Sequence, residues 1–159
     1  MLTPTERRQK IDGIRRLPAE LEAAVQGLND RQLDTPYRPG GWTIRQVVHH
    51  LADSHMNAFV RMKLILTEEK PTLKPYNQDA WANLPDTNAM SLQSSLAILK
   101  GLHERWCTLL ESVPETAWSR TAIHPERGEV LLEGQLITYS SHGEKHVGHI
   151  TGLRSLKGW

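Results

Sequence analysis

The segment from Trp42 to Glu69, WTIRQVVHHLADSHMNAFVRMKLILTEE, decides the fold of this chain. Its apolar side chains recur three and four residues apart and form one continuous stripe, a pattern that predicts a helix. The stripe consists of Ile44, Val47, Val48, Leu51, His55, Ala58, Phe59, Met62, Ile65 and Leu66. A helix with one long apolar side is typical of a helical bundle. We therefore expect a bundle helix that begins at Trp42-Thr43 and ends near Glu69, before Pro71.

Shorter helical patterns precede this segment. Thr3-Pro4-Thr5-Glu6 has the composition of a helix start, and this first helix is expected to end at about Arg16, before Leu17-Pro18. Apolar residues at helical spacing from Leu21 to Leu28 predict a second stretch that reaches Asn29-Asp30. Residues 34–41, DTPYRPGG, support neither a helix nor a central strand and predict a loop.

Further elements are expected after the long helix. Residues 71–85 contain three prolines and predict a long connection with one short helix at about 78–83. A third long helix is expected over 91–112, where Pro114 follows. Residues 123–131 flank an Arg127-Gly128 turn and predict a small hairpin, and a last helix is expected from about Glu133 to Leu156. The pattern indicates an all-α single domain over 1–159, an up-and-down four-helix bundle with a crossover connection.

The overall composition excludes several classes of function. With 19 Lys and Arg against 18 Asp and Glu, the net charge is +1, and there is no long basic run to follow a nucleic acid. No stretch of about 18 apolar residues predicts a membrane span. The single cysteine, Cys107, cannot form an internal disulfide, and no leader pattern is seen, so we expect a cytoplasmic protein.

The most specific chemical signal is a row of histidines on the last predicted helix. His142, His146 and His149 are four and three residues apart and lie on one face of a helix. A pair of imidazoles at this spacing can bind one divalent metal ion, because both rings project from adjacent turns. The alternative is that these histidines are hydrogen-bonded core or surface residues.

The helix from Trp42 offers further donors that could complete such a site. His55 lies near the middle of the apolar stripe, His50 lies at its edge, and His49 lies on the far side. A site at the centre of the core would favour His55, whereas a site at the edge or open end would favour His50. Helical spacing leaves this choice open.

The other reactive residues have structural interpretations. His103 and Cys107 are expected to be packed side chains, and His124 either lines the mouth of a site or is exposed. The sequence contains no phosphate-binding loop, nucleophile elbow or paired-cysteine zinc motif, so the histidines are its one distinct signal.

These motifs resemble one known family. The residues that carry the resemblance are Asp34 to Arg38, Gly40 to Asn57 with the run HHLADSHMN, Pro75-Tyr76, Trp81, His103-x-x-Trp106, His124-Pro125, Leu132-Glu133, Tyr139 and His142-x-x-x-His146-x-x-His149-Ile150-Thr151. Over nearly its whole length the chain resembles the YfiT branch of the DinB-like superfamily. The resemblance implies a four-helix bundle with one divalent metal ion, zinc or nickel, bound by His50, His142 and His146. It makes His55 a neighbour of the ligands, and His149 is either a neighbour or a rival ligand.

The resemblance also implies a function. Members of this branch look like metal-dependent hydrolases that activate water, and related bundles look like S-transferases that use low-molecular-weight thiols such as bacillithiol. We therefore expect a small-molecule substrate. Asp53, Glu133 and Glu144 are candidates for a general base, although each has a structural interpretation. A third hypothesis is a stress-response bundle that is stapled by a metal and has no turnover.

The resemblance further suggests a homodimer. Three aromatic residues, Tyr37, Trp81 and Trp159, are expected to be exposed and to be compatible with such an interface.

Overall fold

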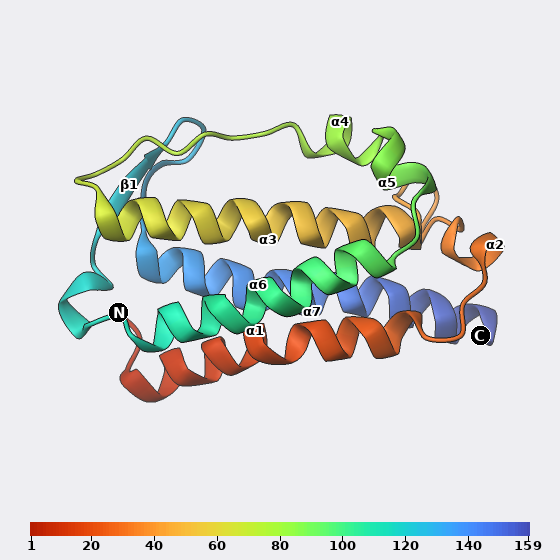
Figure 1. Cartoon of the computed structure of the whole chain (residues 1–159), viewed down its shortest axis with the longest axis horizontal. Helices are drawn as coiled ribbons and strands as arrows, with labels where there is room; N and C mark the ends of the chain where they lie inside the picture. The colour runs from red at the N-terminus through yellow and green to blue at the C-terminus, as the bar shows by residue number, and fades with distance from the viewer.

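Four long helices form the bundle in the computed structural model, which describes all residues from 1 to 159 (Figure 1). They are α1 (Pro4–Val25), α3 (Ile44–Thr67), α6 (Gln93–Glu111) and α7 (Leu132–Lys157). Helix α1 packs against α6 and α7, and α3 packs against the same two helices, so α1 and α3 lie diagonally across the bundle. The predicted all-α four-helix bundle is confirmed.

Helices α3 and α6 form one parallel pair, and α1 and α7 form another, in which Arg7 meets Glu133 and Ala24 meets Arg154. On α3 and α6, His49 contacts Ser95 and the later Met62 contacts the later Trp106. Residue numbers on the two helices therefore rise together, so α3 and α6 run in the same direction. Between α1 and α6 the numbers run in opposite senses, because Ile14 meets His103 whereas the earlier Ile11 meets the later Cys107. Parallel neighbours need a long connection, and residues 68–92 supply the predicted crossover (Figure 1).

This crossover covers the outer side of α3 with two short helices, α4 (Gln78–Ala82) and α5 (Pro85–Ala89). The short helix expected at 78–83 is confirmed, whereas α5 was not predicted from the sequence. Its N-cap, Leu84, makes no side-chain capping bond, and its sequence signals are a proline and an aspartate in the first turn. Because α4 and α5 cover α3, that helix is buried well beyond its apolar stripe.

The predicted hairpin is also present, as β1 (Thr121–His124) paired antiparallel with β2 (Gly128–Leu131). The Ile123 carbonyl accepts a hydrogen bond from the Leu73 amide at 2.8 Å, which ties the crossover to the hairpin. Two further short elements, α2 (Asp30–Leu33) and a 3-10 turn (Glu115–Ala117), lie in connections. No helix combines the length and the apolar character that a membrane crossing requires.

Helix α1 differs from the sequence prediction, because it continues through Pro18 to Val25 instead of ending near Arg16. A proline in a helix has no N–H to donate to the carbonyl four residues earlier, which here is Ile14. In this fold that carbonyl accepts a hydrogen bond from the His103 ring at 2.6 Å. A partner from α6 thus replaces the lost helical bond, and the helix continues. The start is as expected, with Thr3 and Glu6 forming a capping box.

The core consists of two apolar clusters. The Trp106 cluster comprises Ile11, Ile14, Ala58, Phe59, Met62, Ile65, Leu73, Trp106, Cys107, Leu110, Trp118, Ala122, Leu132, Leu136 and Tyr139. The Leu51 cluster comprises Leu17, Leu21, Ala24, Val25, Leu33, Ile44, Val47, Val48, Leu51, Ala52, Leu92, Leu99, Ile150 and Leu153. Along α3, α6 and α7 the switch from one cluster to the other falls at His55, His103 and His142 to His146. A layer of histidines therefore crosses the bundle between the two clusters.

Helix α7 packs tightly against α1 at Gly143, where an added Cβ would lie closer than 3 Å to atoms of the buried Leu17 side chain. Gly143→Ala is expected to lower the free energy of unfolding by about 1–3 kcal/mol, because the core is overpacked there. Gly148→Ala on the same helix meets nothing within 4 Å and is expected to raise stability by about 0.5–1 kcal/mol. Urea unfolding of both variants tests this contrast, and equal effects would contradict it.

The three aromatic residues that were expected to be exposed differ in burial. Trp81 is 37% exposed, as predicted. Tyr37 and Trp159 are half-buried and pack against the Leu51 cluster, so the prediction was wrong for these two residues. The homodimer stays a prediction, and light scattering coupled to gel filtration would test it.

Candidate metal centre

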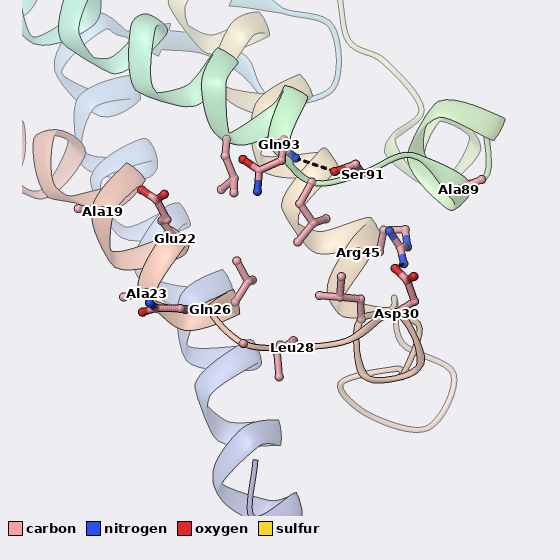
Figure 2. Close-up of a pocket in the computed structure, with 15 residues that line it drawn as sticks. Ala19, Glu22, Ala23, Gln26, Leu28, Asp30, Arg45, Ala89, Ser91 and Gln93 are labelled. Atoms are coloured by element: carbon pink, nitrogen blue, oxygen red, sulfur yellow. Dashed lines mark hydrogen bonds and ion pairs between the residues drawn. The ribbon is translucent and has the colours of Figure 1, made fainter.

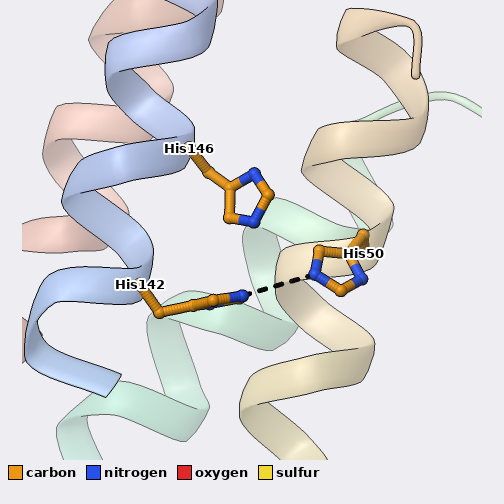
Figure 3. Close-up of side chains that lie close together, drawn as sticks. All are labelled: His50, His142 and His146. Carbon is orange, nitrogen blue, oxygen red and sulfur yellow. Dashed lines mark hydrogen bonds between the residues drawn. The ribbon is translucent and has the colours of Figure 1, made fainter. Parts of the chain in front are cut away.

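Three histidine rings from two helices converge in the space between α3 and α7 (Figure 3). His142 and His146 project from adjacent turns of α7, and His50 faces them from α3. One nitrogen from each ring lies within 4.8 Å of the other two, and the Nε2 atoms of His50 and His142 are 3.4 Å apart. The structure thus brings together the three histidines that the family resemblance singled out.

This arrangement suits a divalent metal ion. Metal–imidazole bonds of about 2.0–2.1 Å in a tetrahedral site place ligand nitrogens about 3.3 Å apart, close to the separation of the His50 and His142 Nε2 atoms. Three imidazoles are a donor set that zinc and nickel accept, so the residues fit such an ion.

Burial keeps all three imidazoles neutral. It lowers the pKa of His50 to about 3, with a smaller contribution from His146. It lowers the pKa of His142 to about 4, helped by His50 and Lys145. Burial also lowers the pKa of His146 to about 3, with His142, His149 and Lys145 acting in the same direction. At neutral pH each ring therefore offers an unprotonated nitrogen to a metal ion.

The low pKa values predict acid sensitivity of the metal-free protein. Between about pH 6.5 and the folded values of about 3 to 4, the unfolded chain binds protons that folded His50, His142 and His146 do not. The contribution of these three neutral histidines to the free energy of unfolding is therefore fully present above about pH 6.5, and it is lost as the pH falls below that value. We expect the melting temperature in chelator to decrease steadily from pH 6.5 to 5, above the ordinary carboxylate range. A constant melting temperature over this interval would contradict the lowered pKa values of the three histidines.

Local structure explains why His50 reaches the cluster. A capping box between Thr43 and Gln46 starts α3 at Ile44, so His50 lies less than two turns from the helix end. Trp42, the residue before the N-cap Thr43, packs on the His50 ring at a centroid distance of 4.6 Å. The Tyr37 amide donates to the Trp42 carbonyl at 3.1 Å and folds the predicted loop 34–41 back against the helix start.

A cavity of about 480 Å³ opens onto the cluster. Its lining comprises Tyr37, Arg38, Gly40, Gly41, Trp42, His50, Gln78, Asp79, His142, Lys145, His146 and His149. Sequence reasoning did not single out Arg38, Gln78, Asp79 or Lys145 as site residues. The one available signal was that residues 34–41 and 71–85 are long connections, a class of segment that often carries function.

His149 and His55 both lie outside the cluster of three. The His149 ring stacks on Tyr37 at 4.2 Å with an interplanar angle of 3°. His55 is fully buried and is hydrogen-bonded to His103 at 2.9 Å and to the Nδ1 atom of His142 at 3.2 Å. His55, the residue expected for a site at the centre of the core, therefore contacts the cluster through the Nδ1 atom of His142. His49, which was placed on the far side of the helix, is buried as well and contacts Ser95 at 2.7 Å.

None of the three carboxylates considered as a general base lines the cavity beside the cluster. Glu133 is buried and accepts hydrogen bonds from Arg7 and the Leu2 amide. Glu144 is exposed and faces a different cavity beside α1. Asp53 is half-buried, and burial raises its pKa. The acidic side chain that does line the cavity is Asp79, from α4.

Two other cavities of the protein differ from this one in their lining. A cavity of about 400 Å³ meets the other side of His142 and is lined by Arg61, His124 and Arg127, among others, so His124 does line a cavity as one of its two interpretations expected. A larger one, of about 920 Å³, lies between α1, the start of α6 and the α2 turn (Figure 2). It contains no histidine, and its Arg45 is bonded to Asp30 and Asp34. The histidine cluster therefore belongs to the smaller cavities.

The fold and the site together define a helical-bundle protein with a candidate three-histidine metal centre. Sequence comparison names the family, because the DinB superfamily model matches residues 14–150. The chain belongs to the DinB superfamily, in its YfiT branch.

Its relatives have consistent names. The Oceanobacillus iheyensis protein named "Putative metal-dependent hydrolase OB0782" is 48% identical over 149 residues, 94% of this chain and 86% of the relative. A Bacillus cereus protein named "Putative metal-dependent hydrolase" is 49% identical with the same coverage. Bacillus subtilis YfiT, described as "a probable metal-dependent hydrolase with an unusual four-helix bundle topology", superposes with a TM-score of 0.98 at 44% identity. That match covers 100% of this chain and 91% of YfiT.

Proposed function

We propose that this protein is a metal-dependent hydrolase of small molecules whose ion is held by His50, His142 and His146. The observation that carries the proposal is the convergence of three neutral imidazoles within 4.8 Å beside a cavity of about 480 Å³. The names of the relatives support the same class of activity. We propose zinc or nickel as the ion, since both accept imidazole ligands. When bound, the ion supplies Lewis acidity, which stabilises negative charge on a water, thiol or carbonyl oxygen beside it.

The side chains of the cavity wall have separate roles in this proposal. The aromatic rings of Tyr37 and Trp42 bind the apolar part of a substrate and exclude water. Arg38 and Lys145 stabilise negative charge that develops on the substrate as its bond breaks. Asp79 accepts the proton that the attacking water loses, because it is the acidic side chain of the wall.

The role of Asp79 gives a specific prediction. Asp79→Asn is expected to lower kcat by about 10²- to 10⁴-fold, because the amide cannot accept a proton, and to leave the metal content unchanged. Glu144→Gln is the matched control, since Glu144 is exposed and lies outside this cavity. Steady-state kinetics beside elemental analysis measures both quantities. If the two variants kept the same kcat, Asp79 would have no such role.

A second candidate is S-transfer from a low-molecular-weight thiol. It is favoured by the two cationic side chains in the wall, Arg38 and Lys145, which would stabilise a thiolate. In this reaction the thiolate sulfur attacks an electrophilic substrate and displaces its leaving group, so no water is consumed.

One experiment compares these functions. Untagged protein is stripped with chelator, reloaded with zinc or nickel, and assayed on chromogenic esters and amides, and separately on a thiol with an alkyl halide. Hydrolysis by the loaded protein alone is the expected result. Thiol consumption without hydrolysis would favour the transferase, and a raised melting temperature with neither activity would favour a metal-stapled bundle.

A further inference from the structure

A chain of hydrogen bonds runs behind His142, from the metal cluster to the opposite side of the bundle. His142 Nδ1 lies 3.2 Å from His55 Nε2, His55 Nδ1 lies 2.9 Å from His103 Nε2, and His103 Nδ1 lies 2.6 Å from the Ile14 carbonyl oxygen. The chain thus joins α7, α3, α6 and α1. We call it the histidine relay.

The relay has a fixed direction because of its last member. A carbonyl oxygen can only accept, so His103 Nδ1 carries the hydrogen. In a neutral ring the other nitrogen is then an acceptor, and His103 Nε2 receives the hydrogen of His55 Nδ1. By the same rule His55 Nε2 receives the hydrogen of His142 Nδ1. His142 Nε2 is therefore left unprotonated, 3.4 Å from His50 Nε2 in the cluster.

Burial favours the neutral form of both intermediate rings. His55 is 0% exposed and His103 is 1% exposed, and no acidic side chain is hydrogen-bonded to either ring. A charged imidazole would be costly in such surroundings. Each ring consequently has one donor and one acceptor, and the relay uses all four of these nitrogens.

Pro18 makes the Ile14 carbonyl available to the relay. In an uninterrupted helix the N–H of residue 18 would donate to this oxygen, but proline has no N–H. The carbonyl is therefore left without its helical donor, and His103 supplies the replacement. Pro18, which the sequence analysis treated as a helix break, thus frees the Ile14 carbonyl oxygen, and this oxygen is the acceptor at the end of the relay.

We propose that Pro18, His103 and His55 are positioning residues that hold His142 in the tautomer with hydrogen on Nδ1, so that Nε2 is free for the metal ion. The inference rests on the proposed function, because the metal site is part of that proposal. An outer partner that accepts a hydrogen bond from a ligand ring fixes the tautomer and the orientation of that ring. Here the partner is His55, which is fixed in turn by His103 and, through the Ile14 carbonyl, by Pro18.

Imidazole nitrogen NMR on the metal-free wild-type protein tests the tautomer directly. The expected result is hydrogen on Nδ1 of His142, with couplings across the hydrogen bonds from His142 to His55 and from His55 to His103. Hydrogen on Nε2 of His142, or the absence of these couplings, would overturn the proposal. This measurement needs neither a variant nor a bound metal.

His55→Leu then tests whether the relay causes the effect. In this variant His142 loses its acceptor, and we expect a mixture of tautomers and zinc affinity weaker by about 10- to 100-fold, measured by competition with a chromophoric chelator. His49→Leu is the matched control, since His49 is also buried on the same helix and contacts Ser95 and Met90 but not the relay. Equal zinc affinities in the two variants would overturn the proposal.

The two proposals can fail separately. If wild-type protein bound no zinc while His142 kept its hydrogen on Nδ1, the metal site would be wrong and the tautomer assignment would stand. If zinc bound to wild type but His55→Leu left both the affinity and the His142 tautomer unchanged, the relay would be wrong and the metal site would stand.

Discussion

Alanine in place of His50 is expected to leave a folded protein that no longer binds a stoichiometric metal ion. His50 is the one member of the cluster contributed by α3, so its removal leaves only the two histidines of α7. Loss of outer partners alone weakens metal binding by about 10- to 100-fold, and we expect the loss of a direct ligand to exceed 100-fold. Elemental analysis of untagged protein, together with circular dichroism to confirm folding, measures the effect.

His149→Ala is the control for this substitution. His149 follows the cluster on α7 and has a buried Nδ1 without a partner, but it lies outside the group of three and stacks on Tyr37. The variant is expected to keep about one metal ion per chain. If His149→Ala lost the ion and His50→Ala retained it, the ligand set would have to be reassigned to include His149.

A second large effect is expected at the buried ion pair between Arg7 and Glu133. The Arg7 side chain is 7% exposed and that of Glu133 is 5% exposed, with 3.1 Å between Arg7 Nε and the carboxylate. Arg7→Met removes this pair together with the hydrogen bonds from Arg7 to Glu115. It leaves the buried Glu133 carboxylate with a hydrogen bond from the Leu2 amide and with the N-terminal ammonium group at 3.9 Å. We expect the free energy of unfolding to fall by about 3 kcal/mol, at the lower end of the range for breaking buried pairs.

The exposed pair of Arg16 and Glu20 provides the comparison. Both residues lie on α1, four positions apart, with side chains 63% and 44% exposed. Arg16→Met is expected to change the free energy of unfolding by no more than about 0.5 kcal/mol. Urea unfolding at neutral pH measures both variants, and similar losses in the two would mean that burial of the Arg7 pair has no special energetic role.

Much of the fold follows from local sequence patterns. The stripe from Ile44 to Leu66 and the turn before Gly128 act over a few residues, so periodicity and turn chemistry were sufficient to predict α3 and the hairpin. Helix α5 is only five residues long and lacks a capping side chain, so neither periodicity nor capping indicated it, whereas the uncapped helices α6 and α7 are long enough to show a periodic pattern. The continuity of α1 through Pro18 depends on His103, which is 89 residues from Ile14 along the chain, and no local pattern contains that partner.

The candidate site was predictable only in part. Spacing placed His142 and His146 on one helix face, but it could not choose between His50 and His55 on the other helix. Both are buried, since the crossover and the neighbouring helices cover most of α3. The family resemblance favoured His50, and the structure places it in the cluster with His55 one hydrogen bond behind. Asp79 and Lys145 were not predicted, because their approach to the histidines depends on how the crossover and α7 pack.

The histidine layer also determines how tolerant the core is to change. Because it separates the Trp106 cluster from the Leu51 cluster, side chains at the two ends of the bundle do not share packing partners. Substitutions more than about 7–10 Å apart without shared partners usually have additive effects on stability. Each end of the bundle can therefore accept substitutions independently of the other. Sequences in this family can diverge, or be redesigned for heat resistance, at one end at a time while the histidine layer between the ends is unchanged.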